Sequence, residues 1–255
     1  MIPRTAQPTR GRWPATLARV ASVCASALAA TLFFAFATAH AGAPADTGTA
    51  TSVDAPWQLR HEDPATGIRV WLRERAGQTP AFRATMPLQA RLSALAAVLL
   101  DSSRTQDWVY RARQAVLLES DGPARGVSLV LTAMPWPLAD RESIVAWQMT
   151  QDPQTLVVTM AGHAVPHARP TAPGRVRMPA FESRWQLTPR PDGLVDVMFE
   201  GHADLGGNLA RPPLRDFVGQ AAWQAPWHTL QGLREIVQRP EFSQAVLPFI
   251  QEPPP

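Results

Sequence analysis

Apolar and polar residues alternate with a period of two along much of the chain. Residues 68–73 read IRVWLR, and residues 82–88 read FRATMPL after a GQTP turn. This alternation is typical of antiparallel strands with one buried face and one wet face. Further strand candidates are separated by turn signals such as DG, DP and PDG. They are residues 115–119, 127–133, 143–150, 155–161, 181–188 and 194–203.

Two segments show helical spacing instead. Residues 91–101 read RLSALAAVLLD, which predicts a short amphipathic helix. Near the C-terminus an apolar stripe begins after Pro212 and Pro213, and it continues past Pro226, which should kink or interrupt the helix, until Pro240. A long antiparallel sheet followed by one long helix is an α+β layout, in which the sheet curls and the helix closes its concave side. Because so few helices cannot fill the inner face of the sheet, we expect a cavity there.

The N-terminal segment has the features of an export signal. Four arginines precede an apolar run, residues 20–39, and the run ends in the small-x-small sequence Ala39-His40-Ala41. We therefore predict a secretory signal peptide over residues 1–41 and a periplasmic mature protein. The alternative is an uncleaved membrane anchor, because the run is nearly long enough to cross a bilayer.

Differences in composition divide residues 42–255 into three segments. Residues 42–56 are small and polar with prolines, which predicts a flexible linker. Residues 57–241 have the size of one domain and contain no repeat or break in composition. Residues 242–255 are expected to form a C-terminal tail whose last residues, QEPPP, are frayed.

Charge and cysteine content exclude several classes of function. All 21 acids but only 20 of the 24 basic residues lie beyond Ala41, so the predicted mature chain of 214 residues has a net charge of −1. That balance argues against binding to nucleic acid. The single cysteine, Cys24, lies in the export segment, which removes disulfides, thiolate nucleophiles and cysteine-bound metals from the mature chain. We expect no cofactor and no metal.

Short motifs give the chain a family resemblance. The stretches WQLRHEDPATGIRVWLRE, PWPLADRE, VRMPAFESRWQLTP, ADLGGNLARPPLRDFV and APWHTLQGLREIV follow the order seen in bacterial START domains, the lipid-transfer domains related to steroidogenic acute regulatory protein. The chain resembles this family from about residue 57 to 238. The resemblance implies a helix-grip fold, in which a strongly curved antiparallel sheet wraps around a long C-terminal helix and encloses a tunnel for one hydrophobic ligand.

The candidate ligand-binding residues follow from the pattern and from the resemblance. Residues 134–142 read MPWPLADRE, and in START domains the equivalent loop lies beside the tunnel mouth. Arg141 can donate to a polar ligand head or form bonds that hold its own loop, and the acid found opposite it in some sterol-binding members is here Gln114. Asp140 suits a structural role at the turn. The full set of predicted lipid-contacting residues is Trp136, Arg141, Arg177, Met178, Trp185, Phe199, Ala222 and Trp223.

The sequence thus predicts an exported, non-enzymatic lipid-binding or lipid-transfer protein. Its partners would be a lipid or another hydrophobic small molecule and, transiently, a membrane surface, and the protein would be a monomer. Two alternatives stay open: an enzyme of the helix-grip superfamily with an acid-base pair inside the cavity, and a cell-envelope interaction module without a ligand. No catalytic residue is identified, since the sequence contains neither a G-x-S-x-G elbow nor a glycine-rich phosphate loop.

Overall fold

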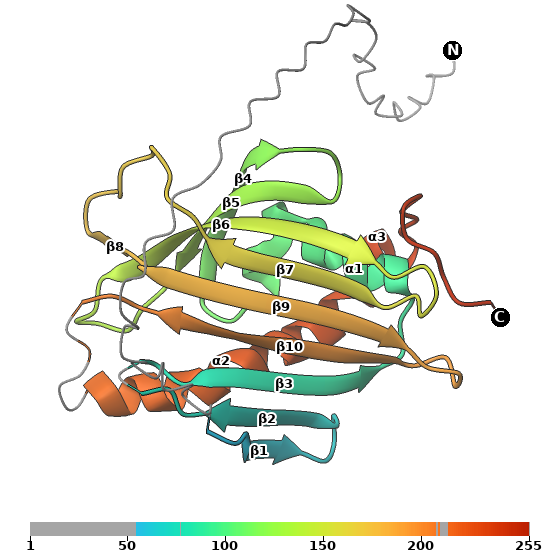
Figure 1. Cartoon of the computed structure of the whole chain (residues 1–255), viewed down its shortest axis with the longest axis horizontal. Coiled ribbons are helices and arrows are strands. Elements are labelled where there is room, and N and C mark those ends of the chain that lie inside the picture. Colours follow the sequence, from blue (N-terminus) through green and yellow to red (C-terminus); the bar gives the residue numbers. More distant parts are fainter. Residues whose placement is uncertain (1–54, 77, 208, 210–213, 255) are drawn as a thin grey trace, which may run out of the picture. The chain divides into compact units, whose positions relative to one another are not determined.

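The computed structural model of the protein describes residues 55–254 except residues 77, 208 and 210–213 (Figure 1). The predicted signal peptide, almost the whole of the predicted linker, and Pro212 and Pro213 lie outside these residues. Among the described residues, no helix is both long enough and apolar enough to cross a membrane.

A single ten-stranded sheet forms most of the fold. Its path runs β1-β2-β3-β10-β9-β7-β6-β5-β4 with antiparallel neighbours, and the short β8 pairs in parallel with β6. The strands are β1 (Gln58–Asp63), β2 (Ile68–Arg73), β3 (Ala81–Leu88), β4 (Ala112–Ser120), β5 (Arg125–Thr132), β6 (Asp140–Gln151), β7 (Val158–Ala164), β8 (Arg175–Arg177), β9 (Ala180–Pro189) and β10 (Val195–Asp204).

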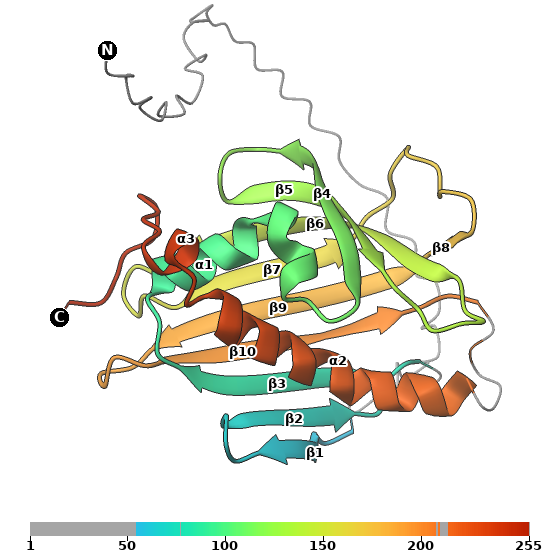
Figure 2. The ribbon, with the colours of Figure 1, turned by 180° about the vertical axis from the view of Figure 1, so that it is seen from behind.

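The helices lie on one side of this sheet. They are α1 (Leu92–Leu100), the 3-10 helix η1 (Ser102–Asp107), α2 (Leu214–Ile236) and α3 (Pro240–Ser243). Figure 2 shows α1, η1 and α2 in front of the sheet, with the β4–β5 end of the sheet curling toward the same side. A large curved sheet around a long C-terminal helix is the helix-grip architecture, so the predicted α+β fold class is confirmed.

Strand alternation separates an inner, helix-facing face of the sheet from an outer face. Directly opposed residues in antiparallel strands share a face, and the pairing Ala84–Phe199–Trp185–Met160–Met149 therefore defines one row on the inner face, across β3, β10, β9, β7 and β6. The charged residues of β2, β3, β9 and β10 fall at the alternate positions, on the outer face. The inner face of these four strands is consequently uncharged.

Glycines allow the sheet to bend. Gly201 in β10, Ser183 in β9 and Gly162 in β7 pair in one inner-face row. A Cβ atom at Gly201 would stand 2.2 Å from the carbonyl oxygen of Glu182, and one at Gly162 would stand 3.0 Å from a methyl of Val145. Because glycine has no Cβ, the neighbouring strands can approach closely there and the sheet can curve over α2.

One predicted strand start is wrong, and of the two effects predicted for Pro226, a kink or an interruption, the interruption does not occur. Strand β7 begins at Val158, whereas the alternation placed its start at residue 155. Asp152 accepts hydrogen bonds from the backbone N–H groups of Gln154 and Thr155 at 2.9 and 2.8 Å, which closes a turn where the strand was expected. Helix α2 is not interrupted by Pro226 but continues to Ile236. Pro226 is buried, so tertiary packing outweighs the lost backbone hydrogen bond.

The C-terminal segment packs against the domain, in contrast to the frayed tail that its prolines suggested. Phe242 and Ile250 are buried in the core. The carboxylate of Glu252 accepts hydrogen bonds from the backbone N–H groups of Leu92 and Ser93, at 2.9 and 2.8 Å. Helix α1 has no side-chain cap of its own at Arg91, and Glu252 supplies the missing acceptor.

Candidate ligand-binding site

An aromatic stack occupies the middle of the inner face. The rings of Trp185 and Phe199 lie parallel, with centroids 4.0 Å apart and planes within 7°. Phe82 meets Phe199 edge-on at 4.8 Å, and Trp108 meets Trp185 edge-on at 5.7 Å. Two predicted ligand-contacting residues, Trp185 and Phe199, are thus in direct contact, and Phe82 and Trp108 extend the same apolar surface.

Helix α2 places a second aromatic group over the β1 side of the sheet. Trp223, one of the predicted residues, stacks on His61 of β1 with centroids 5.0 Å apart, and Trp227 lies 4.7 Å from the same imidazole. Trp223 and Trp227 are four positions apart and therefore share one helical face. Ala222, which was also predicted to line the cavity, is half-buried on the same helix.

The β5–β6 loop holds an exposed tryptophan in a fixed turn. Trp136 is 92 % exposed and follows Pro135, and the peptide bond from Trp136 to Pro137 is cis. The carboxylate of Asp140 accepts a hydrogen bond from the backbone N–H of Met134 at 3.0 Å, which confirms the structural role predicted for this acid. Arg113 pairs with the same carboxylate at 3.0 Å.

Arg141 connects this loop to the turn before α2. Arg141 is 3 % exposed, and its guanidinium donates to the carbonyl oxygens of Leu205 at 2.9 Å, Gly206 at 3.3 Å and Ala139. Burial lowers the pKa of this guanidinium. Gln114 is exposed on β4, and the three hydrogen bonds of Arg141 described above go to backbone carbonyls and not to Gln114. Of the two roles open for Arg141, local bonding is what the structure shows, and contact with a ligand stays a prediction.

The side chain of Arg177 lies on the opposite face of the sheet from the side chain of Arg141. Its Nε and terminal nitrogen donate to the carboxylate of Glu142 at 3.0 and 2.8 Å, and Arg175 approaches the same group at 3.7 Å. Glu142 is only 2 % exposed. Because adjacent residues of β6 point to opposite faces, this ion pair is separated from the aromatic stack by the sheet. The structure does not bring Arg177 together with Trp185.

Met178 is buried beside the same strand. Its backbone N–H donates to the carbonyl of Glu142 at 2.9 Å, and Pro179 packs close to Gly206. Met178 therefore belongs to the packing around the Arg141 turn, and the aromatic stack is formed by other predicted residues.

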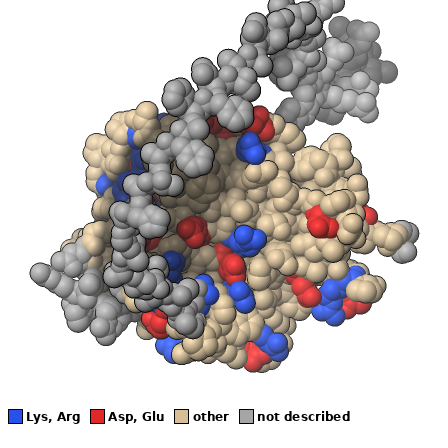
Figure 3. Space-filling model, viewed as in Figure 1, with Lys and Arg blue, Asp and Glu red and all other residues tan. Residues whose placement is uncertain are grey.

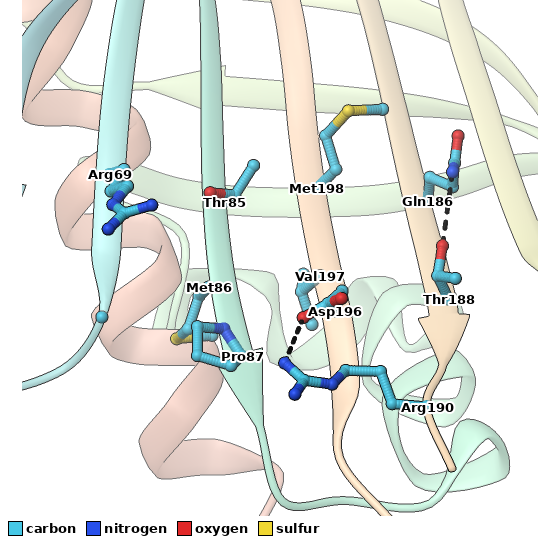
Figure 4. Close-up of a pocket in the computed structure, with 11 residues that line it drawn as sticks. Arg69, Thr85, Met86, Pro87, Gln186, Thr188, Arg190, Asp196, Val197 and Met198 are labelled. Atoms are coloured by element: carbon cyan, nitrogen blue, oxygen red, sulfur yellow. Dashed lines mark hydrogen bonds and ion pairs between the residues drawn. The ribbon is translucent and has the colours of Figure 1, made fainter. Parts of the chain in front are cut away.

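Two depressions lie on the outer face of the sheet. One, of about 490 Å³, is lined by Thr85, Gln186, Arg190, Asp196 and Met198 among others, and Figure 4 shows Arg190 directed at Asp196. A second, of about 570 Å³, lies beside Thr150 and Thr159. Figure 3 shows basic and acidic side chains intermixed on this face. A paired, polar surface of this kind does not suit an apolar ligand.

Several residues of the site were not identified from sequence. His61 lies in β1, a strand whose sequence QLRHED lacks a clear alternation. Trp227 carried a usable signal, since it stands one helical turn after Trp223. The ion pair of Glu142 with Arg177, on the other face of the sheet from the aromatic stack, could not be predicted, because Arg177 comes from β8, a strand of three residues.

Known proteins resemble this chain in sequence and in architecture. No protein-family model matches the chain. An uncharacterized protein of Pseudomonas aeruginosa is 26% identical over 186 residues, which cover 72% of this chain and 87% of that protein. Among solved structures, a STAR-related lipid transfer protein from Xanthomonas axonopodis is 26% identical with a TM-score of 0.63, and the match covers 72% of this chain and 99% of that one.

Human proteins share the fold at lower identity. Human STARD10 is 16% identical with a TM-score of 0.62, covering 74% of this chain and 76% of that one. Human StAR-related lipid transfer protein 5 is 17% identical with a TM-score of 0.59, covering 71% of this chain and 86% of that one. These two likenesses show that the architecture is the same.

Proposed function

Because the chain is a START-domain family protein, we propose that it binds one lipid or other hydrophobic molecule between the inner face of its sheet and α2, and transfers it between membranes. The domain has a lipid-binding and lipid-transfer fold. The observation that carries the proposal for this chain is the stack of Trp185 and Phe199 on the uncharged inner face. Aromatic rings at that place offer an apolar surface to a ligand chain.

The driving force would be desolvation. Each methylene group removed from water contributes about 0.8 kcal/mol. A polar head needs hydrogen bonds inside the protein to offset the loss of water. Arg141 at the loop end of the inner face, and the rings on α2, are the groups placed to supply them. No acid-base catalysis is part of this proposal.

Exchange of the ligand would take place at a membrane surface. Trp136 projects from a turn held by Asp140, and an indole prefers the boundary between lipid and water. We propose that this loop makes transient contact with lipid during loading. The predicted export to the periplasm, with cleavage after Ala41, would place a monomeric carrier next to the membranes that it serves.

Analysis of bound lipid in the purified protein tests the function. The protein is expressed from its full coding sequence in a bacterial host and analysed by native mass spectrometry and by extraction. We expect one hydrophobic molecule per chain and uptake of a fluorescent lipid. A protein that carries no lipid and takes up none would contradict the proposal. The substitution Phe199→Asp, which puts a charge in the stack, should abolish uptake, while Met198→Asp on the outer face should not.

A further inference from the structure

Two ring nitrogens that are buried where α2 packs against β1 have no hydrogen-bond partner among the described residues. Among the described residues, neither Nε2 of His61 nor Nε1 of Trp227 has a partner, and both atoms are buried. The two rings are neighbours, with centroids 4.7 Å apart and planes inclined by 58°. Buried polar atoms are nearly always satisfied in native proteins, so a neighbouring pair of unsatisfied ones indicates a place where another molecule binds.

The pair belongs to the same surface as the aromatic stack. His61 pairs with Val70, Val70 with Ala84, and Ala84 with Phe199. His61 therefore lies in the inner-face row that contains Phe199, three strands away, or about 14 Å at the usual strand spacing. The intervening side chains are apolar and carry no competing hydrogen-bonding group. A ligand whose chain lies on the stack can reach the two nitrogens with one end.

Neighbouring contacts fix the orientation of the two rings. Trp223 stacks against His61 with planes within 28°, and Trp227 also contacts His228 at 4.5 Å. His228 in turn stacks on Tyr110 at 4.7 Å. The rings are therefore confined between β1 and α2, so that a bound group finds the nitrogens already positioned.

The chemistry of the two nitrogens selects the group that they bind. An indole N–H only donates, whereas Nε2 of an imidazole donates or accepts according to its tautomer. A hydroxyl oxygen can accept from Trp227 and, through its own hydrogen, donate to His61. We infer that the ligand is a lipid alcohol whose hydroxyl binds between His61 and Trp227. This inference rests on the proposed lipid-binding function and adds to it the class of ligand and its orientation.

Two probes that differ only in the hydroxyl test the inference. 1-Tetradecanol and its isomer 1-methoxytridecane, an ether with the same number of heavy atoms, compete with an environment-sensitive apolar dye for the protein expressed from its full coding sequence. The ether keeps an apolar chain and the oxygen but cannot donate. We expect the alcohol to bind about two- to tenfold more tightly than the ether, the range that one hydrogen bond contributes.

Substitutions then show which residues cause the preference for the alcohol over the ether. Trp227→Phe and His61→Phe both keep an aromatic ring. His61→Phe removes the acceptor for the hydroxyl hydrogen and should bring the alcohol-to-ether ratio close to one, whereas Trp227→Phe removes a donor that both oxygens can use and should weaken both probes. Phe199→Leu is the matched control: it removes an apolar contact in the same row, so it should weaken both probes by the same factor. Circular dichroism and thermal melts establish that each variant is folded.

The outcomes distinguish a failure of the inferred hydroxyl site from a failure of the proposed lipid binding. Equal affinity for alcohol and ether, tighter binding of tetradecanoate than of the alcohol, an unchanged ratio in His61→Phe, or unchanged affinity of both probes for Trp227→Phe would overturn the hydroxyl site while leaving lipid binding intact. Failure of the dye and both probes to bind at all would contradict the proposed function itself.

Discussion

The Nε atom of Arg141 donates a hydrogen bond to the carbonyl oxygen of Leu205 over 2.9 Å, which connects the start of β6 to the turn that precedes α2. These two residues are 64 positions apart in sequence. The same guanidinium binds Gly206 and Ala139. The bond therefore joins the two segments that would have to separate when a ligand enters beside the loop.

Replacing Arg141 with Met should destabilise this connection. Hydrogen bonds to a charged group contribute roughly 1.5 to 3 kcal/mol each, and removal of a desolvated charge offsets part of the loss, so we expect the free energy of unfolding to fall by about 2 to 4 kcal/mol. Urea denaturation measures the change, and faster hydrogen exchange at residues 205–207 would locate it. Arg113→Met is the control, because that side chain is largely exposed. Unchanged stability with lost lipid uptake would instead assign Arg141 to the ligand.

Replacing Gly201 with Ala should oppose the curvature of the sheet. The new Cβ would stand 2.2 Å from the carbonyl oxygen of Glu182, so β9 and β10 must separate. Overpacking of this kind costs about 1 to 3 kcal/mol in the free energy of unfolding. Gly219→Ala in α2 is the matched control, since nothing lies within 4 Å of its added Cβ. That variant should gain up to about 1 kcal/mol through helix propensity. Equal effects in thermal melts of the two variants would contradict the explanation.

The alternation of apolar and polar residues was sufficient to predict the fold, but it predicted neither the edge strand β1 nor the continuity of α2. Period-two alternation identifies β2 and β3 because each buries one face against the helices. Strand β1 has no such pattern, since most of its side chains are exposed, and only its pairing with β2 makes it a strand. The helix is not interrupted at Pro226 for a similar reason: the cost of a proline in a helix is local, whereas the packing that outweighs it is not.

The site was predictable where it depends on alternation and not where it depends on register. Trp185 and Phe199 both fall on apolar positions of their strands, but their stacking follows from the pairing of β9 with β10. The hydrogen bonds of Arg141 to backbone carbonyls cannot be predicted from the sequence, because every residue has a backbone carbonyl. Glu142 shows the same limit, since its burial depends on a pairing between β6 and β8.

The C-terminal segment is expected to contribute to stability through Glu252. Its carboxylate accepts two hydrogen bonds from the first turn of α1. Glu252→Ala should lower the free energy of unfolding by about 1 kcal/mol, as the loss of a helix cap does. Chemical denaturation measures the change. Glu241→Ala is the comparison, because that carboxylate is exposed and meets Arg104 only at 3.4 Å. No difference between the two variants would mean that the cap contributes nothing.

Trp136 should affect membrane binding and not folding. With 92 % of its surface exposed, Trp136→Ala is expected to change the free energy of unfolding by less than about 0.5 kcal/mol. Partial burial of an indole in lipid contributes about 1 to 2 kcal/mol, so binding to anionic lipid vesicles should weaken roughly five- to thirtyfold. Co-sedimentation with vesicles provides the measurement. Leu59→Ala, an exposed apolar residue on β1, controls for hydrophobicity alone. Equal loss in both variants would remove the loop from the membrane contact.

His202 should make the fold sensitive to mild acid. Burial, reinforced by the positive charge of Arg75, lowers the pKa of this imidazole, although the carboxylates of Glu182 and Asp204 oppose the shift. The unfolded chain therefore takes up the proton near pH 6.5, before the folded protein does. It follows that the free energy of unfolding is highest above about pH 6.5 and falls as the pH drops from there through the lowered pKa of the folded state.

The size and origin of this pH dependence can be measured directly. One proton changes the free energy of unfolding by at most about 1.4 kcal/mol per pH unit, and urea denaturation between pH 7.5 and 5 resolves such a slope. His202→Asn should flatten the curve over this range, because the variant has no group there to titrate. His163→Asn, which replaces an exposed imidazole on β7, is the comparison variant for the loss of a histidine. If His202→Asn unfolds with the same slope as the wild type, acid sensitivity must come from another group.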